Sequence, residues 1–311
     1  MLFQIYTKLT GGDIFTKMDY VILDLEWNSS YSKKAKHFIS EIIEFGAVRF
    51  NDKFEVLDTF SMLVIPQVGK KLSGKIKELT NISNEELAKG GATYTHVLSK
   101  FKKFLGESML LTWGTSDILA LMENTDYYEK NKHIDYIITY CDLQRYCANA
   151  LDVYNPGRQL GLAMAAQFAD VDITDMVQHR ALQDATISMM IFKKLFDKDK
   201  LPEYIETSDS LYERMVFVPY YLTDIDDPRI NKSEFSFVCD QCRNELVAEE
   251  PWTRRNRSFV ALLKCEGCGR SFKGKIKFKI NYEGMSIKKK LVPCTQNDDE
   301  EEKKEETSDN I

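Results

Sequence analysis

Short apolar runs that end in turn residues or acids divide the first two thirds of the chain. The run 20–26 (YVILDLE) is short and contains two β-branched residues, which predicts a buried strand. Further strands are predicted over 41–50, 54–65, 109–113 and 135–140, and helices over 75–79, 93–105, 142–151, 159–169 and 183–196, with two more beginning near 83 and 116. The polar stretch 27–40 predicts a loop. This order of elements is typical of a mixed α/β sheet flanked by helices.

The last third of the chain has a different pattern. Two runs, 259–263 and 273–280, predict strands of a separate small β unit, and prolines interrupt the segment before it. We therefore expect a flexible leader over 1–17, a main α/β domain over 18–200, a connector over 201–234, a small β domain over 235–292 and a disordered acidic tail over 293–311.

Composition indicates a globular chain with a full core and an uneven distribution of charge. The 311 residues are 43% hydrophobic and 29% charged, and no apolar run approaches the length of about 18 residues that a membrane helix needs. The first ten residues lack the features of a signal peptide. The net charge of −6 conceals an acidic tail and a basic stretch, 239–290, with thirteen Lys/Arg and six Asp/Glu. Such a stretch predicts contact with a polyanion, and a solvated charged surface is the alternative.

Four of the seven cysteines form two Cys-x-x-Cys pairs separated by 22 residues. These four residues are Cys239, Cys242, Cys265 and Cys268. Two such pairs predict one structural Zn²⁺ in a closed tetrahedral site, and a redox or disulfide pair is the alternative. Because the cysteine number is odd and no secretory signal is seen, we expect a reducing compartment, the cytoplasm.

Two acids follow the apolar part of the first predicted strand. Asp24 and Glu26 are two residues apart, so on a strand their side chains project from the same face. Two like charges at that distance are unfavourable unless a cation lies between them. Oxygen ligands of this kind suit Mg²⁺ or Mn²⁺.

Three more candidate residues lie downstream. Asp117 follows the predicted strand 109–113 at a strand-to-helix junction, where sites form in α/β sheets, although an acid there is also an ordinary helix cap. Asp184 opens an apolar helix, and a carboxylate in such a position is unfavourable unless it is paired or bound to a metal ion. His179 precedes Asp184 by five residues, and a lone histidine is more often structural than catalytic.

The order Asp24-x-Glu26, then Asp117, then His179-x4-Asp184 resembles the three-motif signature of the DEDDh exonucleases. The residues around the motifs agree, including 41–48 (EIIEFGAV), Trp113-Gly114 before the second motif and His179-Arg180-Ala181 in the third. The resemblance covers about 18–196 and implies a ribonuclease H-like fold. One departure concerns substrate choice, because Trp27-Asn28 follows the first motif where the family often has Thr-Gly.

The resemblance implies a 3′-to-5′ exonuclease that releases nucleoside 5′-monophosphates from a single-stranded end. The four carboxylates would hold two Mg²⁺ or Mn²⁺ ions, which can activate a water and stabilise the leaving oxygen. His179, whose unperturbed pKa lies near 6.5, is suited to accept the proton of that water. The alternative is a catalytically inactive protein that binds nucleic acid or docks another protein on a nuclease-derived fold.

Substrate contacts outside the motifs remain open in the sequence. Trp27 either stacks on a base or packs against the polar insertion, and by alternation it points away from the acids unless the strand bends. In the small β domain, basic residues alternate with aromatic ones, which predicts a phosphate-binding surface or a protein-docking face. These basic residues are Arg254, Arg255, Arg257, Lys273, Lys275, Lys277 and Lys279. The sequence does not distinguish single-stranded DNA from RNA.

Overall fold

A computed structural model describes residues 18–69, 71–154, 159–176, 179–282 and 284–294. The chain divides into two compact units, with the boundary between Met215 and Val216. The expected leader and nearly all of the expected tail lie outside the described residues. Over the described residues, no helix combines the length and the apolar character needed to cross a membrane.

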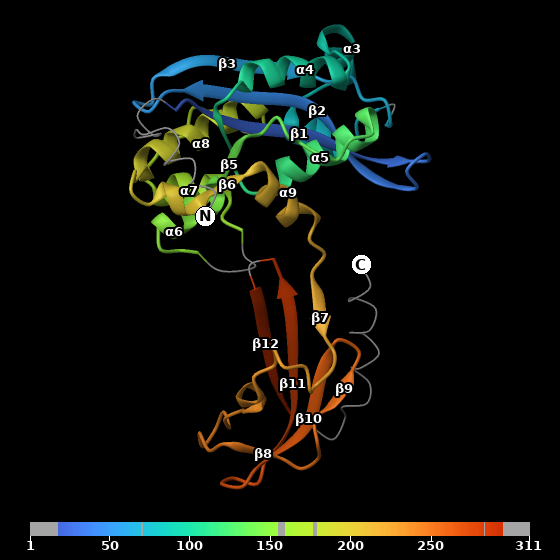
Figure 1. The fold of residues 1–311 in the computed structure, drawn as a ribbon, viewed down its shortest axis with the longest axis vertical. Helices are drawn as coiled ribbons and strands as arrows, with labels where there is room; N and C mark the ends of the chain where they lie inside the picture. The colour runs from blue at the N-terminus through green and yellow to red at the C-terminus, as the bar shows by residue number, and fades with distance from the viewer. Residues whose placement is uncertain (1–17, 70, 155–158, 177–178, 283, 295–311) are drawn as a thin grey trace. The chain divides into compact units, whose positions relative to one another are not determined.

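A six-stranded mixed sheet forms the centre of the first unit (Figure 1). Its order is β3-β2-β1-β4-β5-β6, with β1 antiparallel to β2 and parallel to β4. The strands are β1 (Tyr20–Ser32), β2 (His37–Phe50), β3 (Val56–Leu63), β4 (Met109–Thr112), β5 (Thr139–Asp142) and β6 (Ile205–Thr207). The start of β1 lies between β2 and β4 and is buried on both faces, as its continuous apolar run predicts.

Two groups of helices cover the two faces of this sheet. Val21, Leu23 and Leu25 of β1 pack with α4 (Tyr94–Leu105), α5 (Ser116–Glu129) and α9 (Ser208–Val216). Tyr20 and Ile22 pack with α6 (Leu143–Ala150), α7 (Leu162–Phe168) and α8 (Ala181–Leu195). Two short helices, α2 (Gly74–Thr80) and α3 (Asn84–Gly90), follow β3. The expected mixed α/β sheet flanked by helices is confirmed, and the alternation along β1 decides which residues face α8.

The loop prediction for 27–40 is wrong. Both strands of the central hairpin continue through this stretch, and only the residues between β1 and β2 form a turn. Asn28, Ser30 and Ser32 are small polar residues that are buried in alternation. The Oδ1 atom of Asn28 accepts the N–H of Ser73, so the loop after β3 covers this polar face. A pattern of hydrophobic residues cannot reveal a strand whose inward side chains are polar.

The expected connector over 201–234 is divided between the two units. Residues 205–207 form β6, which pairs with β5, and Leu211 of α9 is completely buried in the first core. Beyond the boundary, β7 (Tyr220–Leu222) pairs with β11 (Ser271–Asn281) of the second unit. The segment therefore adds an edge strand and a covering helix to the first unit and a strand to the second.

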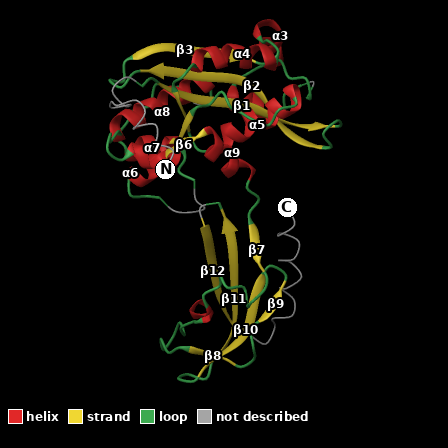
Figure 2. Cartoon of the chain, in the orientation of Figure 1, coloured by secondary structure: helices red, strands yellow, loops and turns green. Residues whose placement is uncertain are grey.

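The second unit is a β sheet with the path β12-β11-β10-β8 (Figure 2). Its remaining strands are β8 (Leu246–Ala248), β9 (Thr253–Arg255), β10 (Ser258–Cys265) and β12 (Gly284–Pro293). Phe259, Phe272, Ile276 and Phe278 are buried in its own core. The strands predicted at 259–263 and 273–280 are both present, which agrees with a separate small β unit.

Candidate active site and thiolate cluster

The first two candidate acids lie where β1 passes α8. Asp24 and Glu26 continue the alternation of Tyr20 and Ile22, so they project on the α8 face of the sheet. Opposite them on β2, Asp24 pairs in register with Gly46 and Glu26 pairs with Glu44. The pairing register of β1 with β2 shifts between Glu26 and Trp27, so the ladder is irregular directly after the second acid.

Asp117 reaches the same place from α5. This helix begins after the turn that ends β4, the parallel neighbour of β1, so its first turn lies at the end of the sheet next to Asp24. The backbone N–H of Leu25, between the two acids of β1, donates to Oδ1 of Asp117 over 2.9 Å. Asp117 is only 4% exposed. Thr115, the N-cap residue, makes no side-chain cap hydrogen bond.

Asp184 and His179 come from the start of α8. The N–H of His179 donates to Oδ2 of Asp184 over 3.1 Å, while Oδ1 is buried without a hydrogen-bond partner among the described residues. His179 is exposed and has a φ of +63°, in the left-handed region that is strained for a residue with a side chain. Ligand atoms of Glu26, His179 and Asp184 lie within 4.8 Å of one another.

Two residues without a predicted role in the site hold this segment in place. The buried carboxylate of Glu44 accepts hydrogen bonds from Nε and Nη2 of Arg180, the shortest 2.8 Å, and from the N–H of Ala181 over 3.1 Å. Gly46 lets the backbone approach, because a Cβ there would lie 1.9 Å from the nitrogen of Leu182. Glu44 and Gly46 thus hold the strained turn that carries His179 in place against β2. The sequence offered one signal for this role, because Glu44 is an acid inside the apolar run 41–48.

The acids of the site carry like charge in a buried setting. Burial, followed by the neighbouring Asp117, Asp184 and Glu26, raises the pKa of Asp24 well above its usual value. Burial and then the charges of Asp184 and Glu44 raise the pKa of Glu26 to about 8. Burial raises the pKa of Asp117 to about 7, and it also raises the pKa of Asp184. In the protein alone these groups therefore hold their protons to a higher pH than ordinary carboxyl groups do, and a bound cation would shift their pKa values back down.

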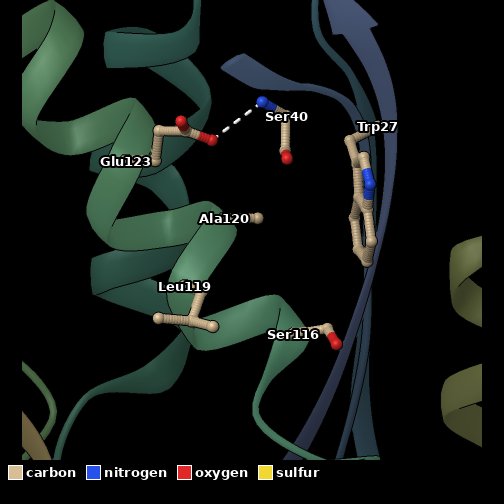
Figure 3. A pocket seen from close by; sticks show the side chains of 6 residues that line it. All are labelled: Trp27, Ser40, Ser116, Leu119, Ala120 and Glu123. Carbon is tan, nitrogen blue, oxygen red and sulfur yellow. Dashed lines mark hydrogen bonds between the residues drawn. The ribbon is translucent and has the colours of Figure 1, made fainter. Parts of the chain in front are cut away.

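All five predicted residues line one pocket of about 300 Å³. Its lining also includes Trp27, Trp113 and Gln144. Trp27 also lines a second pocket of about 400 Å³, which lies between the central hairpin and α5 (Figure 3). In Figure 3 the indole faces Ser116 and Ala120 across this space, and Glu123 accepts the N–H of Ser40 over 2.8 Å.

The four paired cysteines of the second unit also converge. Their sulfur atoms all lie within 4.8 Å of one another, with 3.6 Å between Cys239 and Cys268 and 3.3 Å between Cys242 and Cys265. Zn–S bonds of about 2.3 Å in a tetrahedron place sulfur atoms about 3.8 Å apart, so the donor set fits a closed thiolate site. The cluster fits the expected C-terminal zinc ribbon.

A mixed α/β sheet with an acidic pocket at its central strand and an imidazole beside it defines the class of protein. Comparisons with known proteins assign that class: the chain belongs to the exonuclease family (RNase T), whose model matches residues 21–192. The predicted relationship to the DEDDh exonucleases is thereby confirmed.

Several relatives share this unit. A PolC-type DNA polymerase III of Clostridium perfringens is 31% identical over 212 residues, which is 67% of this chain but 13% of the polymerase. A probable 3′-5′ exonuclease, KapD, of Bacillus subtilis is 27% identical over 61% of this chain and 89% of its own. The solved nuclease domain of 3′hExo, described as a DEDDh family member bound to rAMP, shares the fold with a TM-score of 0.52 and 22% identity, over 63% of this chain and 98% of that domain.

Proposed function

We propose that this protein is a 3′-to-5′ exonuclease that hydrolyses the terminal phosphodiester bond of single-stranded nucleic acid and releases nucleoside 5′-monophosphates. The observation that carries the proposal is the convergence of four carboxylates from β1, α5 and α8 with His179 around one pocket. Membership of the exonuclease family supports the reaction class.

The pocket fits a pair of divalent cations. Burial first, and then the neighbouring carboxylates, raise the pKa values of Asp24 and Glu26, and Oδ1 of Asp184 has no hydrogen-bond partner among the described residues. We propose that Asp24, Glu26, Asp117 and Asp184 hold two Mg²⁺ or Mn²⁺ ions, since hard cations take carboxylate oxygens. When bound, such ions supply Lewis-acid stabilisation of the phosphoryl oxygens and of the leaving oxygen.

His179 is proposed to act as the general base. It is exposed at the pocket, and a ring nitrogen lies within 4.8 Å of carboxylate oxygens of Glu26 and Asp184. Its strained backbone is held by the hydrogen bond to Asp184 and by the ion pair of the next residue, Arg180, with Glu44. From this position its imidazole can accept the proton of a water whose oxygen attacks the terminal phosphorus. The bond between that phosphorus and the 3′ oxygen of the penultimate nucleotide breaks, and this oxygen takes a proton from solvent to become the new 3′ hydroxyl of the shortened strand.

Trp27 is proposed to position the terminal base. Residue Trp27 lines both the acidic pocket and the neighbouring pocket beside α5, and its indole faces the latter, so a base entering there would lie against a large aromatic face. Base–aromatic stacking tolerates all bases, which suits a sequence-independent exonuclease. A contact to the 2′ position of the sugar would be needed to distinguish RNA from DNA.

For the second unit, we propose one structural Zn²⁺ on Cys239, Cys242, Cys265 and Cys268. Four thiolates leave no open coordination position, so the ion would stabilise the fold and take no part in hydrolysis. An odd number of cysteines, four of them in two Cys-x-x-Cys pairs, suits a reducing compartment, and we propose the cytoplasm.

A digestion assay tests the proposed reaction. Single strands of DNA and RNA with a 5′ label are incubated with the protein and Mg²⁺, and the products are separated by length. We expect a ladder that shortens from the 3′ end, with nucleoside 5′-monophosphates released, and no cleavage without a divalent ion. Shortening from the 5′ end would contradict the polarity. Binding without hydrolysis in Mg²⁺ or Mn²⁺ would favour the inactive binding protein.

A further inference from the structure

The sheet of the second unit has two chemically different faces. Along β11, Phe272, Ile276 and Phe278 are fully buried in the unit's core, and lysines alternate with them. The lysines therefore project from the opposite face of the sheet.

Strand β12 extends this cationic face. In the register of the β11–β12 ladder, Lys275 pairs with Lys290 and Lys277 pairs with Lys288, and paired residues project from the same side. Lys289 pairs with Ile276 and lies over the ring of Phe237, so it belongs to the core side. The lysine face consists of Lys273, Lys275, Lys277, Lys279, Lys288 and Lys290.

Neighbouring strands add no negative charge to this face. Over their described residues, β7, β8, β9, β10, β11 and β12 contain ten Lys/Arg and no Asp or Glu. Lys279 pairs with Tyr221 of β7, and the guanidinium of Arg257 lies over that tyrosine ring at 5.4 Å.

We propose that the lysine face is a second nucleic-acid site that binds the phosphate backbone of the strand whose 3′ end is being degraded. The class of ligand rests on the proposed exonuclease function. Residues two apart on a strand are about 6.8 Å apart and adjacent strands about 4.8 Å apart, so the ammonium groups form a regular array. Lysines act as point charges towards phosphate, which gives binding that is independent of sequence and dependent on salt.

The site would act on long substrates and leave short ones unaffected. A trinucleotide occupies only the acidic pocket, whereas a long strand gains additional phosphate contacts and a second point of attachment. Attachment at two sites raises the effective concentration of the 3′ end near the pocket. The expected consequence is tighter binding and faster degradation of long strands alone.

The test uses the full chain in two backgrounds. Lys275, Lys277, Lys288 and Lys290 are changed together to Gln, and a control variant carries the same charge change at Lys100, Lys103, Lys193 and Lys194, which are exposed on α4 and α8. In the Asp24→Asn background, binding of a long labelled single strand is measured by fluorescence anisotropy over a range of salt concentrations. In the otherwise native chain, hydrolysis of a trinucleotide and of a long strand is measured.

We expect the face variant to bind on the order of tenfold or more weakly, with a salt slope lower by about 0.7 for each phosphate that is no longer neutralised. The control variant should keep its affinity, and both variants should hydrolyse the trinucleotide like the native chain. Equal affinity and slope in the two variants would overturn the proposal whether or not the protein is an exonuclease. Competition by poly-glutamate as effective as that by oligonucleotide of equal charge would also overturn it, in favour of an acidic protein partner. Failure of the native chain to hydrolyse the trinucleotide would instead contradict the proposed function.

Discussion

Glu26 and Glu44 pair in register on adjacent strands, yet their surroundings differ completely. Glu44 accepts hydrogen bonds from the guanidinium of Arg180 and from the N–H of Ala181, so its charge is compensated within the protein. Glu26 lies among other carboxylates, and the pKa of its side chain rises to about 8. The two glutamates therefore have different roles: Glu44 fixes a backbone segment, and Glu26 is available to bind a cation.

Glu41, further along β2, supports the same distinction. It is fully buried, and its carboxylate accepts the N–H groups of Gln67, Val68 and Gly69 over 2.5–2.8 Å and the hydroxyl of Tyr128 over 2.7 Å. The carboxylates of β2 thus have their donors within the protein, whereas the side chains of Asp24 and Glu26 in β1 accept no hydrogen bond from a described residue. Burial alone does not mark a functional acid. The acids of the pocket differ from those of β2 in that each faces other carboxylates and lacks a cationic partner at hydrogen-bond distance among the described residues.

The largest expected effect comes from removing one uncompensated acid. Asp24→Asn should lower the rate of hydrolysis on the order of 10³-fold, because the metal contribution to the transition state is several kcal/mol. The same change should leave the melting temperature without Mg²⁺ unchanged or higher, since Asn has the size of Asp and removes a carboxyl group whose ionisation is unfavourable at this buried position. Steady-state kinetics and thermal unfolding check the two parts. An active Asp24→Asn protein would show that the pocket is not the site of hydrolysis.

Breaking the compensated pair should act mainly on stability. Arg180→Ala leaves the carboxylate of Glu44, 2% exposed, without its partner, and should lower the free energy of unfolding by about 3 kcal/mol. Chemical denaturation measures this loss. Arg180→Lys keeps the charge but not the paired hydrogen bonds and should give an intermediate value. If Arg180→Ala is as stable as the native chain, the ion pair between Arg180 and Glu44 does not stabilise the fold.

The dependence of stability on pH should distinguish the uncompensated acids as a group. The pKa of Glu26, about 8, and that of Asp117, about 7, lie above their unfolded values, so between about pH 4 and 8 the folded chain holds more protons than the unfolded chain. Without added Mg²⁺ the melting temperature should therefore fall as the pH rises through this range.

Added Mg²⁺ should offset that fall, most strongly at the upper end of the range, where the carboxylates are ionised. At a concentration 100 times the dissociation constant, the stabilisation should be about 2.7 kcal/mol. Differential scanning calorimetry with and without Mg²⁺ gives both curves. A melting temperature that rises with pH in the metal-free protein would contradict the assignment of raised pKa values to the pocket.

The smallest expected effect concerns Trp27, which borders the acids without compensating them. Trp27→Ala should weaken substrate binding by about 1–3 kcal/mol, the usual contribution of stacking to a base, mostly as a higher KM. Trp27→Phe should recover much of the loss. Comparable kcat values in the three proteins would support a binding role, and an unchanged KM in Trp27→Ala would assign the indole to packing against the hairpin.

The sequence revealed the elements that carry the pocket because the acids interrupt strong local patterns. Asp24 and Glu26 end an apolar run, and Asp184 opens an apolar helix, so periodicity alone places them on definite faces. The ion pair between Arg180 and Glu44 was not predicted, because the two residues are 136 positions apart and no local sequence pattern connects them. The extension of the central hairpin was missed because its buried side chains, such as Ser30, are polar.

The central claim is that the acids of β1, α5 and α8 form a site for two metal ions, and a Mn²⁺ titration followed by electron paramagnetic resonance tests it most directly. Zinc-loaded native protein, Asp24→Asn and Glu44→Gln are titrated in the presence of a nucleoside 5′-monophosphate. We predict two bound Mn²⁺ ions in the native chain and in folded Glu44→Gln, and fewer in Asp24→Asn. No Mn²⁺ binding by the native chain, or binding that Asp24→Asn leaves unchanged, would contradict the account.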